Sequence, residues 1–381
     1  MLHSPSVLVC PLDWGIGHAT RCVPVIRKFQ AEGYRVILAA DGRALDFLQK
    51  EFPECRSIRF PGARITYTTS RLFAMKMLFI SPVLLFGIFR ENAKLKKLIG
   101  SEKPDIIFSD NRYGLWSKDV RCIFMTHQLN IIAPGSFRMF SGLINKFLHF
   151  LIRKFDECWV PDLAASPGLA GSLSHPAKIS FPVHYIGLLS RFSHYGHHDT
   201  KADERSLDFM AILSGPEPQR TIFEEKIFED ARVSGLSGVI VRGRTEETDA
   251  WDLTENISVF SHLTTQKMEE FIRSSKIIIC RAGYSGIMDL VALGKSAVLV
   301  PTPGQTEQEY LAAHLAGRKL FCSMSQEKFD FLKAIEMFSD CKEPGVNENN
   351  DQLLETRMKK VPDSIGSAST EKFNHPGTET G

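Results

Sequence analysis

The sequence lacks an excess of charge of either sign. Its 381 residues include 46 Lys or Arg and 44 Asp or Glu, so the formal net charge is +2. This balance gives no global electrostatic reason to bind nucleic acid, and we expect no nucleic-acid partner. Hydrophobic residues make up 43% and charged residues 24% of the chain, which excludes collagen-like, coiled-coil and wholly disordered proteins. A chain of this length usually divides into two domains.

The eight cysteines lack the CxxC spacing of metal and redox motifs. They are scattered, and several end or lie inside apolar runs: Cys10, Cys22, Cys55, Cys122, Cys158, Cys280, Cys322 and Cys341. We interpret them as reduced thiols in the core. No basic segment with an apolar core and a cleavage site precedes the strand-like run Val7 to Cys10, so the cytoplasm is the expected compartment.

A metal-ligand pattern is also lacking. Three histidines, His194, His197 and His198, gather near the middle of the chain, but no acidic or Cys partner recurs there at ligand spacing. The surrounding region 190–207 is rich in His, Ser, Gly and charged residues, which is typical of a linker. A metal site is the alternative for these histidines, but we predict a linker and no metal.

Both halves of the chain alternate short apolar runs with longer helical patterns. The runs are Val7 to Cys10, Val36 to Ala39, Ile106 to Phe108, Cys122 to Met125 and Cys158 to Val160, then Phe209 to Leu213, Gly238 to Val241, Ile257 to Phe260, Ile277 to Cys280 and Ala297 to Val300. This alternation is typical of β-α units with a mostly parallel sheet. We predict an α/β fold with two Rossmann-like domains, 1–189 and 208–340. Apolar residues thin out after residue 340, so 341–381 is predicted to be a disordered tail.

A glycine turn follows the first apolar run and contains Gly15, Gly17 and His18. Glycines at a strand-to-helix turn let a ligand approach the backbone, and the helix N-terminus favours anions. Thr20 occupies the place of the third glycine of the dinucleotide fingerprint, which disfavours a plain NAD site. His18 is expected at the mouth of a cleft, where its imidazole can accept a proton from an acceptor hydroxyl. A helix-capping or hydrogen-bonded structural histidine is the alternative.

Two further strand ends in the first half carry polar side chains. Asp110 follows the run Ile106 to Phe108, and His127 follows Ile123 to Met125. Ligands of open α/β sheets bind outside the carboxyl ends of the strands, so both residues are candidates for the acceptor side of the site. Asp110 is equally an ordinary turn former, and His127 can simply bond to backbone.

The most informative segment lies in the second half, between Cys280 and Glu309. It consists of a strand, a glycine turn, a short helix closed by Gly294, another strand and a polar loop. A helix that begins near Ser285 directs free N–H groups at a diphosphate without needing a metal. Asp289, one turn into that helix, is placed to accept hydrogen bonds from ribose hydroxyls, and Gln308 and Glu309 are placed to bind sugar hydroxyls. Arg281, Gly283 and Gly286 complete this candidate donor site.

Together these residues resemble the C-terminal domain of glycosyltransferase family 28, which includes the N-acetylglucosaminyltransferases that make lipid II. The family has a Gly-rich turn, an acidic residue on the following helix, then Pro and a Gln-containing segment. The matching positions are Gly283, Asp289, Pro301 and Gln308-Glu309. Asp289 replaces the commoner Glu, and Glu309 stands where a second Gln is frequent. The turn from Gly15 to His18 is similar to the first glycine loop of the family, so the resemblance covers roughly residues 6 to 325 and implies the two-domain GT-B architecture.

Weaker signals fit the same resemblance. Ser214 and Gly215 follow the first strand of the second half, where such enzymes carry a loop near the donor phosphates, although an ordinary turn is the alternative. Arg242 ends the next strand. Leu263 precedes a helix at the position where related enzymes bind the nucleobase through backbone groups. The resemblance thus implies a UDP-sugar donor, no metal cofactor, and inversion at the sugar.

The expected reaction is direct displacement at the anomeric carbon. His18, or as a second candidate Asp13, removes the acceptor proton, while the helix after Gly283 stabilises the leaving diphosphate. A UDP-sugar 2-epimerase shares the architecture, but the acidic cluster that it needs is not visible in the first half. A non-catalytic, UDP-sugar-binding partner subunit of another transferase is a third possibility. The sequence therefore favours a glycosyltransferase over both alternatives.

Two apolar helical stretches in the first half suggest contact with a membrane. They are Leu72 to Phe89, which is followed by Lys and Arg residues, and Phe137 to Phe155, which contains them. The first includes Lys76 and Pro82 and is too short to be a good spanning helix. Docking at the inner face of the plasma membrane, near a lipid-linked or other glycan acceptor, fits this pattern better. Two core helices flanked by solvated charge are the alternative.

Overall fold

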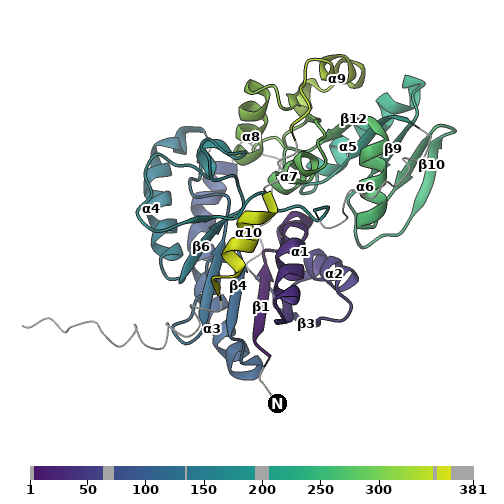
Figure 1. Ribbon diagram of the computed structural model, residues 1–381. Coiled ribbons are helices and arrows are strands. Elements are labelled where there is room, and N and C mark those ends of the chain that lie inside the picture. The colour runs from purple at the N-terminus through teal and green to yellow at the C-terminus, as the bar shows by residue number, and fades with distance from the viewer. Residues whose placement is uncertain (1–3, 63–72, 134, 194–205, 346–349, 362–381) are drawn as a thin grey trace, which may run out of the picture.

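The computed structural model describes residues 4–62, 73–133, 135–193, 206–345 and 350–361. Two seven-stranded sheets form the framework (Figure 1). The first has the order β3-β2-β1-β4-β5-β6-β7 and is parallel throughout. Its strands are β1 (Ser6–Pro11), β2 (Arg35–Ala40), β3 (Arg56–Arg59), β4 (Ile106–Asp110), β5 (Arg121–Met125), β6 (Glu157–Val160) and β7 (His184–Tyr185). Its helices are α1 (Ile16–Ala31), α2 (Gly42–Glu51), α3 (Phe73–Glu102) and α4 (Ser141–Ile152).

The second sheet has the order β10-β11-β9-β8-β12-β13-β14 and is parallel except for the pair β10–β11. Its strands are β8 (Leu207–Ile212), β9 (Gly238–Val241), β10 (Ala250–Thr254), β11 (Ile257–Phe260), β12 (Ser275–Cys280), β13 (Val298–Leu299) and β14 (Cys322–Ser323). Its helices are α5 (Gln219–Ser234), α6 (Thr265–Ser274), α7 (Tyr284–Ala292), α8 (Thr306–Gly317) and α9 (Phe331–Phe338). The predicted α/β class with two Rossmann-like domains is confirmed, and each of the ten predicted runs contains a strand.

The central strands are apolar throughout because both faces of each sheet are covered. In β1, Val7 and Val9 belong to one buried cluster, and Leu8 and Cys10 belong to another on the opposite face. Side chains of a strand alternate between faces, so a strand that is buried on both sides appears as a continuous apolar run. The cluster that contains Val7 also includes residues of the second domain, such as Met210. The two domains therefore share part of one core.

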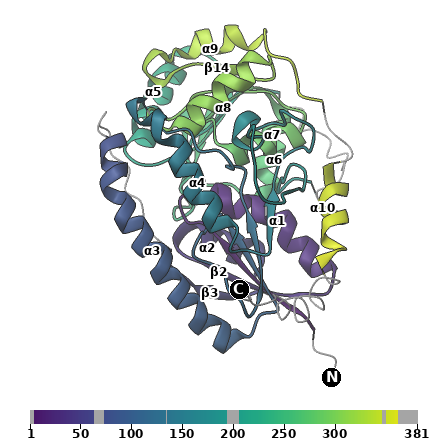
Figure 2. The same ribbon diagram turned by 90° about the vertical axis from the view of Figure 1, so that its left-hand side faces the viewer.

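A last helix, α10 (Asn350–Met358), corrects the prediction of a disordered tail over 341–381. Leu354, Met358 and Val361 are buried and belong to the same cluster as α1. Lys28 of α1 pairs with Glu355 at 2.7 Å, and Arg357 pairs with Glu157 of β6. Figure 2 shows α10 beside α1. Three well-spaced apolar residues are enough to dock this helix on the first domain, despite the polar composition around them.

The start of the predicted linker is also part of the packed structure. Ser190 and Phe192 are buried, and Phe192 joins the core cluster. The three histidines fall in 194–205, outside the described residues, and Leu207, the last residue of the predicted linker, already begins β8. Over the part of the chain that is described, no group of three potential ligands gathers to hold a metal. Nor does any helix within the described ranges have the length and apolarity needed to span a membrane.

Two cysteines differ from the expectation of eight reduced thiols. Cys322 and Cys341 are joined in a disulfide, which brings β14 and the segment after α9 together. The other six cysteines are free, and all of them except the half-buried Cys55 lie in the core, as expected. The scattered spacing of the cysteines argued against metal and redox motifs, but spacing does not reveal which distant cysteines come together when the chain folds.

Candidate active site

Three neighbouring strands of the first sheet end in residues that the sequence singled out. β1 leads into the turn with Gly15, Gly17 and His18; Asp110 is the last residue of β4; and His127 follows β5. β4 lies between β1 and β5, and the three strands are parallel, so their carboxyl ends meet at one edge of the sheet. The structure therefore brings His18, Asp110 and His127 together.

Gly15 and Gly17 are each glycine for a different structural reason. Gly15 precedes α1 with φ 154° and ψ 162°, a conformation that residues with a side chain rarely adopt. Gly17 allows a close approach: an added Cβ would lie 3.2 Å from Ser285 Oγ of the second domain. Ser285 Oγ donates to the carbonyl oxygen of Gly17 at 2.7 Å. The glycine turns of the two domains thus touch each other.

His18 is held by a buried carboxylate. Its Nδ1 lies 3.0 Å from Oδ2 of Asp110, whose side chain is fully buried, while that of His18 is 19% exposed. Burial opposes ionisation of Asp110, but Arg21 and His18 outweigh it and lower its pKa to about 2. Burial, reinforced by Arg21, lowers the pKa of His18 below its usual 6.5. A neutral imidazole oriented by a carboxylate is suited to act as a general base.

Arg21 belongs to this cluster, and sequence reasoning missed it. Its Nε donates to Oδ2 of Asp110 at 2.9 Å, and its Nη2 donates to Oδ1. Its Nη2 and Nη1 also lie 2.9 Å from Nδ1 of His18 and of His127, respectively. The side chain is 1% exposed. The only signal in the sequence is its spacing of three residues from His18, which puts both on one face of a helix.

His127 connects the two domains. Its Nε2 lies 2.8 Å from Oε1 of Glu307 at the start of α8, and its ring stacks on Tyr284 of α7 at 4.3 Å between centroids. Burial opposes ionisation of Glu307, but His127 outweighs it and lowers the pKa of that carboxyl. Tyr284 also donates to the carbonyl oxygen of Pro161 at 2.9 Å. Glu307, like Arg21, was not among the predicted site residues.

The first turn of α7 borders open space. A Cβ built on Gly283 or on Gly286 would meet no atom within 4 Å. The turn contains no acidic residue that would repel an anion. Free N–H groups at the start of a helix favour phosphate groups. This turn, which touches Gly17 through Ser285, can therefore hold a diphosphate.

Asp289, the candidate ribose ligand, is bonded to the segment that joins the domains. Ser190 Oγ donates to its Oδ1 at 2.7 Å, and Nε of Arg191 forms an ion pair with its Oδ2 at 3.3 Å. Burial, which outweighs Arg191 and Ser190, raises the pKa of Asp289. Nη1 of Arg191 is buried and has no hydrogen-bond partner among the described residues. Buried guanidinium nitrogens are rarely left unpaired, so Arg191, which the sequence did not indicate, is a candidate for binding an anion.

Gln308 and Glu309 hold the loop that precedes them. Gln308 Oε1 accepts from the main-chain nitrogen of Thr302 at 2.9 Å, and its Nε2 donates to Oε1 of Gln305 at 2.6 Å. Glu309 Oε1 accepts from the nitrogen of Gly304 at 2.9 Å. Both side chains thus order the loop at the start of α8. Binding sugar hydroxyls, as the sequence predicted, requires them to share or exchange these bonds.

Other predicted donor residues lie at the carboxyl ends of the second sheet. Gly215, after β8, has φ 105°, and an added Cβ would lie 3.4 Å from Thr302 Oγ1; Ser214 precedes it. Arg281 donates to the carbonyl oxygens of Gln219 and Val300 at 2.7 and 3.2 Å, and burial lowers its pKa to about 10. These contacts show Arg281 supporting the backbone of the loops. Leu263 is buried in the core before α6.

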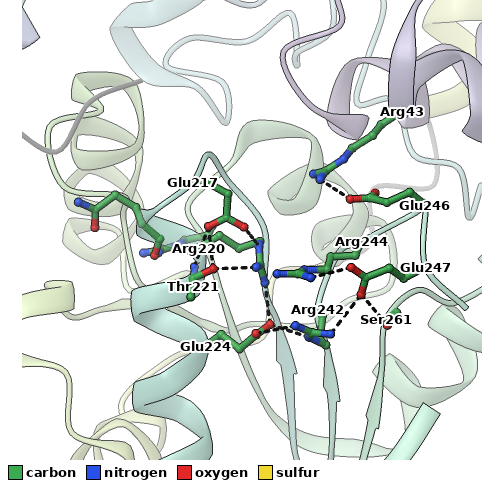
Figure 3. Close-up of polar contacts among 12 residues, drawn as sticks. Arg43, Glu217, Arg220, Thr221, Glu224, Arg242, Arg244, Glu246, Glu247 and Ser261 are labelled. Atoms are coloured by element: carbon green, nitrogen blue, oxygen red, sulfur yellow. Dashed lines mark hydrogen bonds and ion pairs between the residues drawn. The ribbon is translucent and has the colours of Figure 1, made fainter. Parts of the chain in front are cut away.

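Arg242 is enclosed by carboxylates, as Figure 3 shows. Its Nε and Nη2 each donate to Glu224 at 2.9 Å, and its Nη1 donates to Glu247 at 3.2 Å. Arg244 donates to Glu247 at 2.6 Å, and Arg43 of the first domain pairs with Glu246. Because its charge is already matched by two carboxylates, Arg242 is better placed to order the loop after β9 than to bind a phosphate.

Asp13, the second candidate base, faces another element. Its Oδ2 would lie 3.0 Å from a Cβ added to Gly42, the first residue of α2. The carboxylate that orients His18 is that of Asp110. Of the two candidates, His18 is therefore the one placed in the hydrogen-bonded cluster described above.

Comparison with known proteins identifies glycosyltransferases as relatives of this chain. Residues 241–362 match the glycosyltransferase family 28 C-terminal domain. An uncharacterized glycosyltransferase of Methanosarcina acetivorans is 25% identical over 314 residues, which cover 77% of each chain. The UDP-N-acetylglucosamine--N-acetylmuramyl-(pentapeptide) pyrophosphoryl-undecaprenol N-acetylglucosamine transferase of Sulfurihydrogenibium sp. is 23% identical over 366 residues, covering 94% of this chain and 93% of that one.

Solved structures show the same fold. The spinosyn rhamnosyltransferase SpnG complexed with thymidine diphosphate aligns with a TM-score of 0.59 at 14% identity, over 97% of this chain and 99% of that one. MurG of Acinetobacter baumannii aligns with a TM-score of 0.53 at 13% identity, over 95% and 99%. The chain is thus a GT-B glycosyltransferase that resembles family 28. These relatives are transferases, and they lend no support to an epimerase or a non-catalytic subunit.

Proposed function

We propose that this family 28-like glycosyltransferase moves a sugar from a UDP-sugar, similar to UDP-N-acetylglucosamine, to a hydroxyl of a lipid-linked or other glycan acceptor. One observation carries the proposal. His18, oriented by Asp110, lies in the first turn of α1, which touches the first turn of α7 through the Ser285–Gly17 hydrogen bond. A base and a diphosphate site therefore stand next to each other, as sugar transfer from a nucleotide donor needs.

The proposed step is a direct displacement. Nε2 of His18 takes the proton of the acceptor hydroxyl while its oxygen attacks the anomeric carbon. The bond from that carbon to the diphosphate breaks on the opposite face, so the sugar is inverted. The N–H groups at the start of α7 stabilise the charge that develops on the diphosphate, and they can do this without a metal ion. Asp110 orients His18 and stabilises the imidazolium that forms.

The nucleotide is proposed to lie along the second domain. Arg191, with its unpaired buried Nη1, is suited to a phosphate, and Asp289 is suited to ribose hydroxyls once Ser190 releases its Oδ1. The main chain near Leu263 is proposed to bind the base, and the loop with Gln308 and Glu309 the sugar. The name of the Sulfurihydrogenibium relative specifies a UDP-sugar donor, whereas the SpnG complex contains thymidine diphosphate. The Sulfurihydrogenibium transferase is more similar to this chain in sequence, 23% identical against 14% for SpnG, and this favours UDP as the nucleotide.

An apolar surface on the first domain supports a lipid-linked acceptor. Along α4 and the turn before it, exposed fractions reach 81% for Met139, 69% for Leu143 and 56% for Phe150, and Figure 1 shows α4 on the outer side of this domain. Exposed basic residues lie among them, such as Lys146. Contiguous apolar residues beside positive charge suit an anionic lipid surface. We propose that this surface docks on the inner face of the plasma membrane.

Ligand-dependent stabilisation tests the donor. Thermal unfolding is measured with UDP, dTDP and GDP and with their sugars. UDP is expected to raise Tm most, by an amount that grows with the logarithm of its concentration above Kd. A larger shift with dTDP than with UDP would replace the proposed donor. The product of the best sugar, incubated with a lipid-linked acceptor, is then identified by mass spectrometry.

Vesicle flotation tests the surface. Wild-type protein is expected to float with anionic vesicles at low salt, and Leu143→Ser with Met139→Ser is expected to reduce floating protein several-fold. Val233→Ser removes an equally exposed apolar side chain, 86% exposed, from the second domain and serves as the matched control. Absence of wild-type binding at low salt would rule out membrane docking and leave the transfer reaction to be tested with a diffusible acceptor.

A further inference from the structure

Glu307, a carboxylate of the second domain, contacts the cluster around His18 in the first domain through His127. Its Oε1 lies 2.8 Å from Nε2 of His127, and its Oε2 accepts a hydrogen bond from Nε2 of Gln128. The side chain of His127 is only 4% exposed, and that of Glu307 is 34% exposed. A carboxylate of one domain is thus bonded to a buried imidazole of the other.

The neighbours of His127 fix the position of its ring proton. Nη1 of Arg21 lies 2.9 Å from Nδ1 of His127, and a guanidinium can only donate hydrogen bonds. Nδ1 must therefore accept, so the proton of the neutral ring is on Nε2 and points at Glu307. A carboxylate that accepts a hydrogen bond from this N–H makes the other ring nitrogen a stronger acceptor, as it does for metal-bound histidines. Here the cation that the histidine holds is Arg21.

Arg21 lies within reach of two histidines. Its Nη2 is 2.9 Å from Nδ1 of His18. If Arg21 donates there, the ring proton of His18 is on Nε2, and that atom cannot take a proton from the acceptor. If Nδ1 of His18 instead donates to Oδ2 of Asp110, at 3.0 Å, Nε2 keeps its lone pair. His127 holds Nη1 of Arg21, and this fixes the guanidinium in the orientation in which its Nε and Nη2 donate to the two oxygens of Asp110. That orientation directs Nη2 to Asp110 and favours the second arrangement.

We infer that Glu307 is a positioning residue for the base. By strengthening the hold of His127 on Arg21, it leaves Nδ1 of His18 to Asp110 and so selects the tautomer of His18 that can remove a proton. Because Glu307 belongs to α8 of the second domain, the base is complete only where the domains meet at this contact. The inference rests on the proposed role of His18 as the base.

Graded substitutions separate positioning from donor binding. Glu307→Met removes the carboxylate and is expected to lower kcat about tenfold to a hundredfold, with the Kd for UDP unchanged within about twofold. Glu307→Gln keeps an acceptor for His127 and is expected to fall between wild type and Glu307→Met. Tyr310→Phe, the matched control, removes another interdomain bond of α8, the one to the main-chain nitrogen of Ser172 at 2.7 Å, and is expected to leave kcat unchanged. A change in UDP affinity larger than the change in kcat would overturn the inference.

Combining Glu307→Met with His18→Ala separates a failure of the role of Glu307 from a failure of His18 as the base. If Glu307 acts through His18, adding Glu307→Met to His18→Ala causes no further loss of turnover. A further loss equal to that seen in wild type would make Glu307 an independent, structural contact. Wild-type turnover in His18→Ala alone would refute the proposed base, whatever Glu307 does.

Nitrogen-15 NMR spectra of protein with labelled histidines report the tautomer of each imidazole without a measurement of turnover. Wild-type His127 is expected as the Nε2–H tautomer and His18 as the Nδ1–H tautomer. In Glu307→Gln and Glu307→Met the His18 signal is expected to move towards Nε2–H. An unchanged His18 tautomer in folded variants would overturn the inference.

Discussion

The two sides of the domain interface differ in what their candidate functional side chains are bonded to. On the first-domain side, Asp110 is bonded to both His18 and Arg21. On the second-domain side, Asp289 is bonded to the segment that joins the domains, and Gln308 to its own loop. The first side is pre-organised, whereas the second must exchange internal bonds for bonds to a ligand. Changes on the first side should therefore affect rate, and changes on the second side should affect affinity.

The largest effect is expected for His18. His18→Ala removes the general base and should lower kcat about 10²–10⁴-fold, because no other group takes its place beside Asp110. Turnover is measured with saturating donor and acceptor. Near wild-type turnover would mean that His18 is a structural residue, and it would contradict the claim that changes on the first-domain side affect the rate.

The buried ion pair of Asp110 should make the stability of the folded protein depend on pH. Its pKa is lowered from 3.8 to about 2 in the folded protein, so the stability it contributes is present above about pH 4 and is lost as pH falls towards 2. Nearly two pKa units correspond to about 2–3 kcal/mol. Denaturant unfolding between pH 5 and 2 is expected to show this loss in wild type and a smaller one in Asp110→Asn. Equal slopes in the two proteins would contradict the buried ion pair.

Asp289 should behave in the opposite way to His18. Asp289→Ala is expected to weaken UDP binding about ten- to a hundredfold, since a hydrogen bond to a charged group contributes about 1.5–3 kcal/mol. Calorimetry with UDP measures the change, and circular dichroism checks that the variant is folded. Unchanged affinity in a folded variant would remove Asp289 from the donor site.

The pH dependence of the rate sharpens the assignment of the base. Because the pKa of His18 is lowered below 6.5, a base that works when neutral should stay active as pH falls to about 6.5 and lose activity only below it. The quantity to measure is kcat/KM from pH 5 to 8. An acid limb centred above pH 6.5 would mean that His18 is not the titrating base.

Ser190 should have the smallest effect, and one of opposite sign. Its hydroxyl occupies Oδ1 of Asp289 at 2.7 Å, so Ser190→Ala frees this oxygen for a ligand. UDP affinity is expected to rise about two- to fivefold, because the ribose hydroxyl no longer has to displace the hydroxyl of Ser190, a net gain of about 0.5–1 kcal/mol. Weaker binding would show that Ser190 supports the site instead of competing for it.

Much of the fold could be predicted from the sequence because the central strands are buried on both faces. The strands that were missed lie at or near sheet edges and carry polar residues: β3 consists of Arg56–Arg59, and β10 begins with three exposed residues. Nor did composition reveal α10, because its few apolar residues, Leu353, Leu354 and Met358, lie in a mostly polar segment. Apolar runs predict strands only where burial requires them.

The candidate site was predictable at strand ends and less so elsewhere. Gly17, His18 and Asp110 follow apolar runs, and that position alone pointed to them. Arg21 and Glu307 lie within helices, where no local pattern separates them from solvated charges. Their roles depend on contacts between α1, β5 and α8, which only the packing of the two domains creates.

The division between the two sides is tested most directly by UDP binding to His18→Ala. Calorimetry is carried out on this variant and on Asp289→Ala under the same conditions, next to wild type. We predict that His18→Ala binds UDP with wild-type affinity although it has lost turnover, and that Asp289→Ala has lost affinity. A loss of UDP binding in His18→Ala as large as that in Asp289→Ala would contradict the division of base and donor between the two domains.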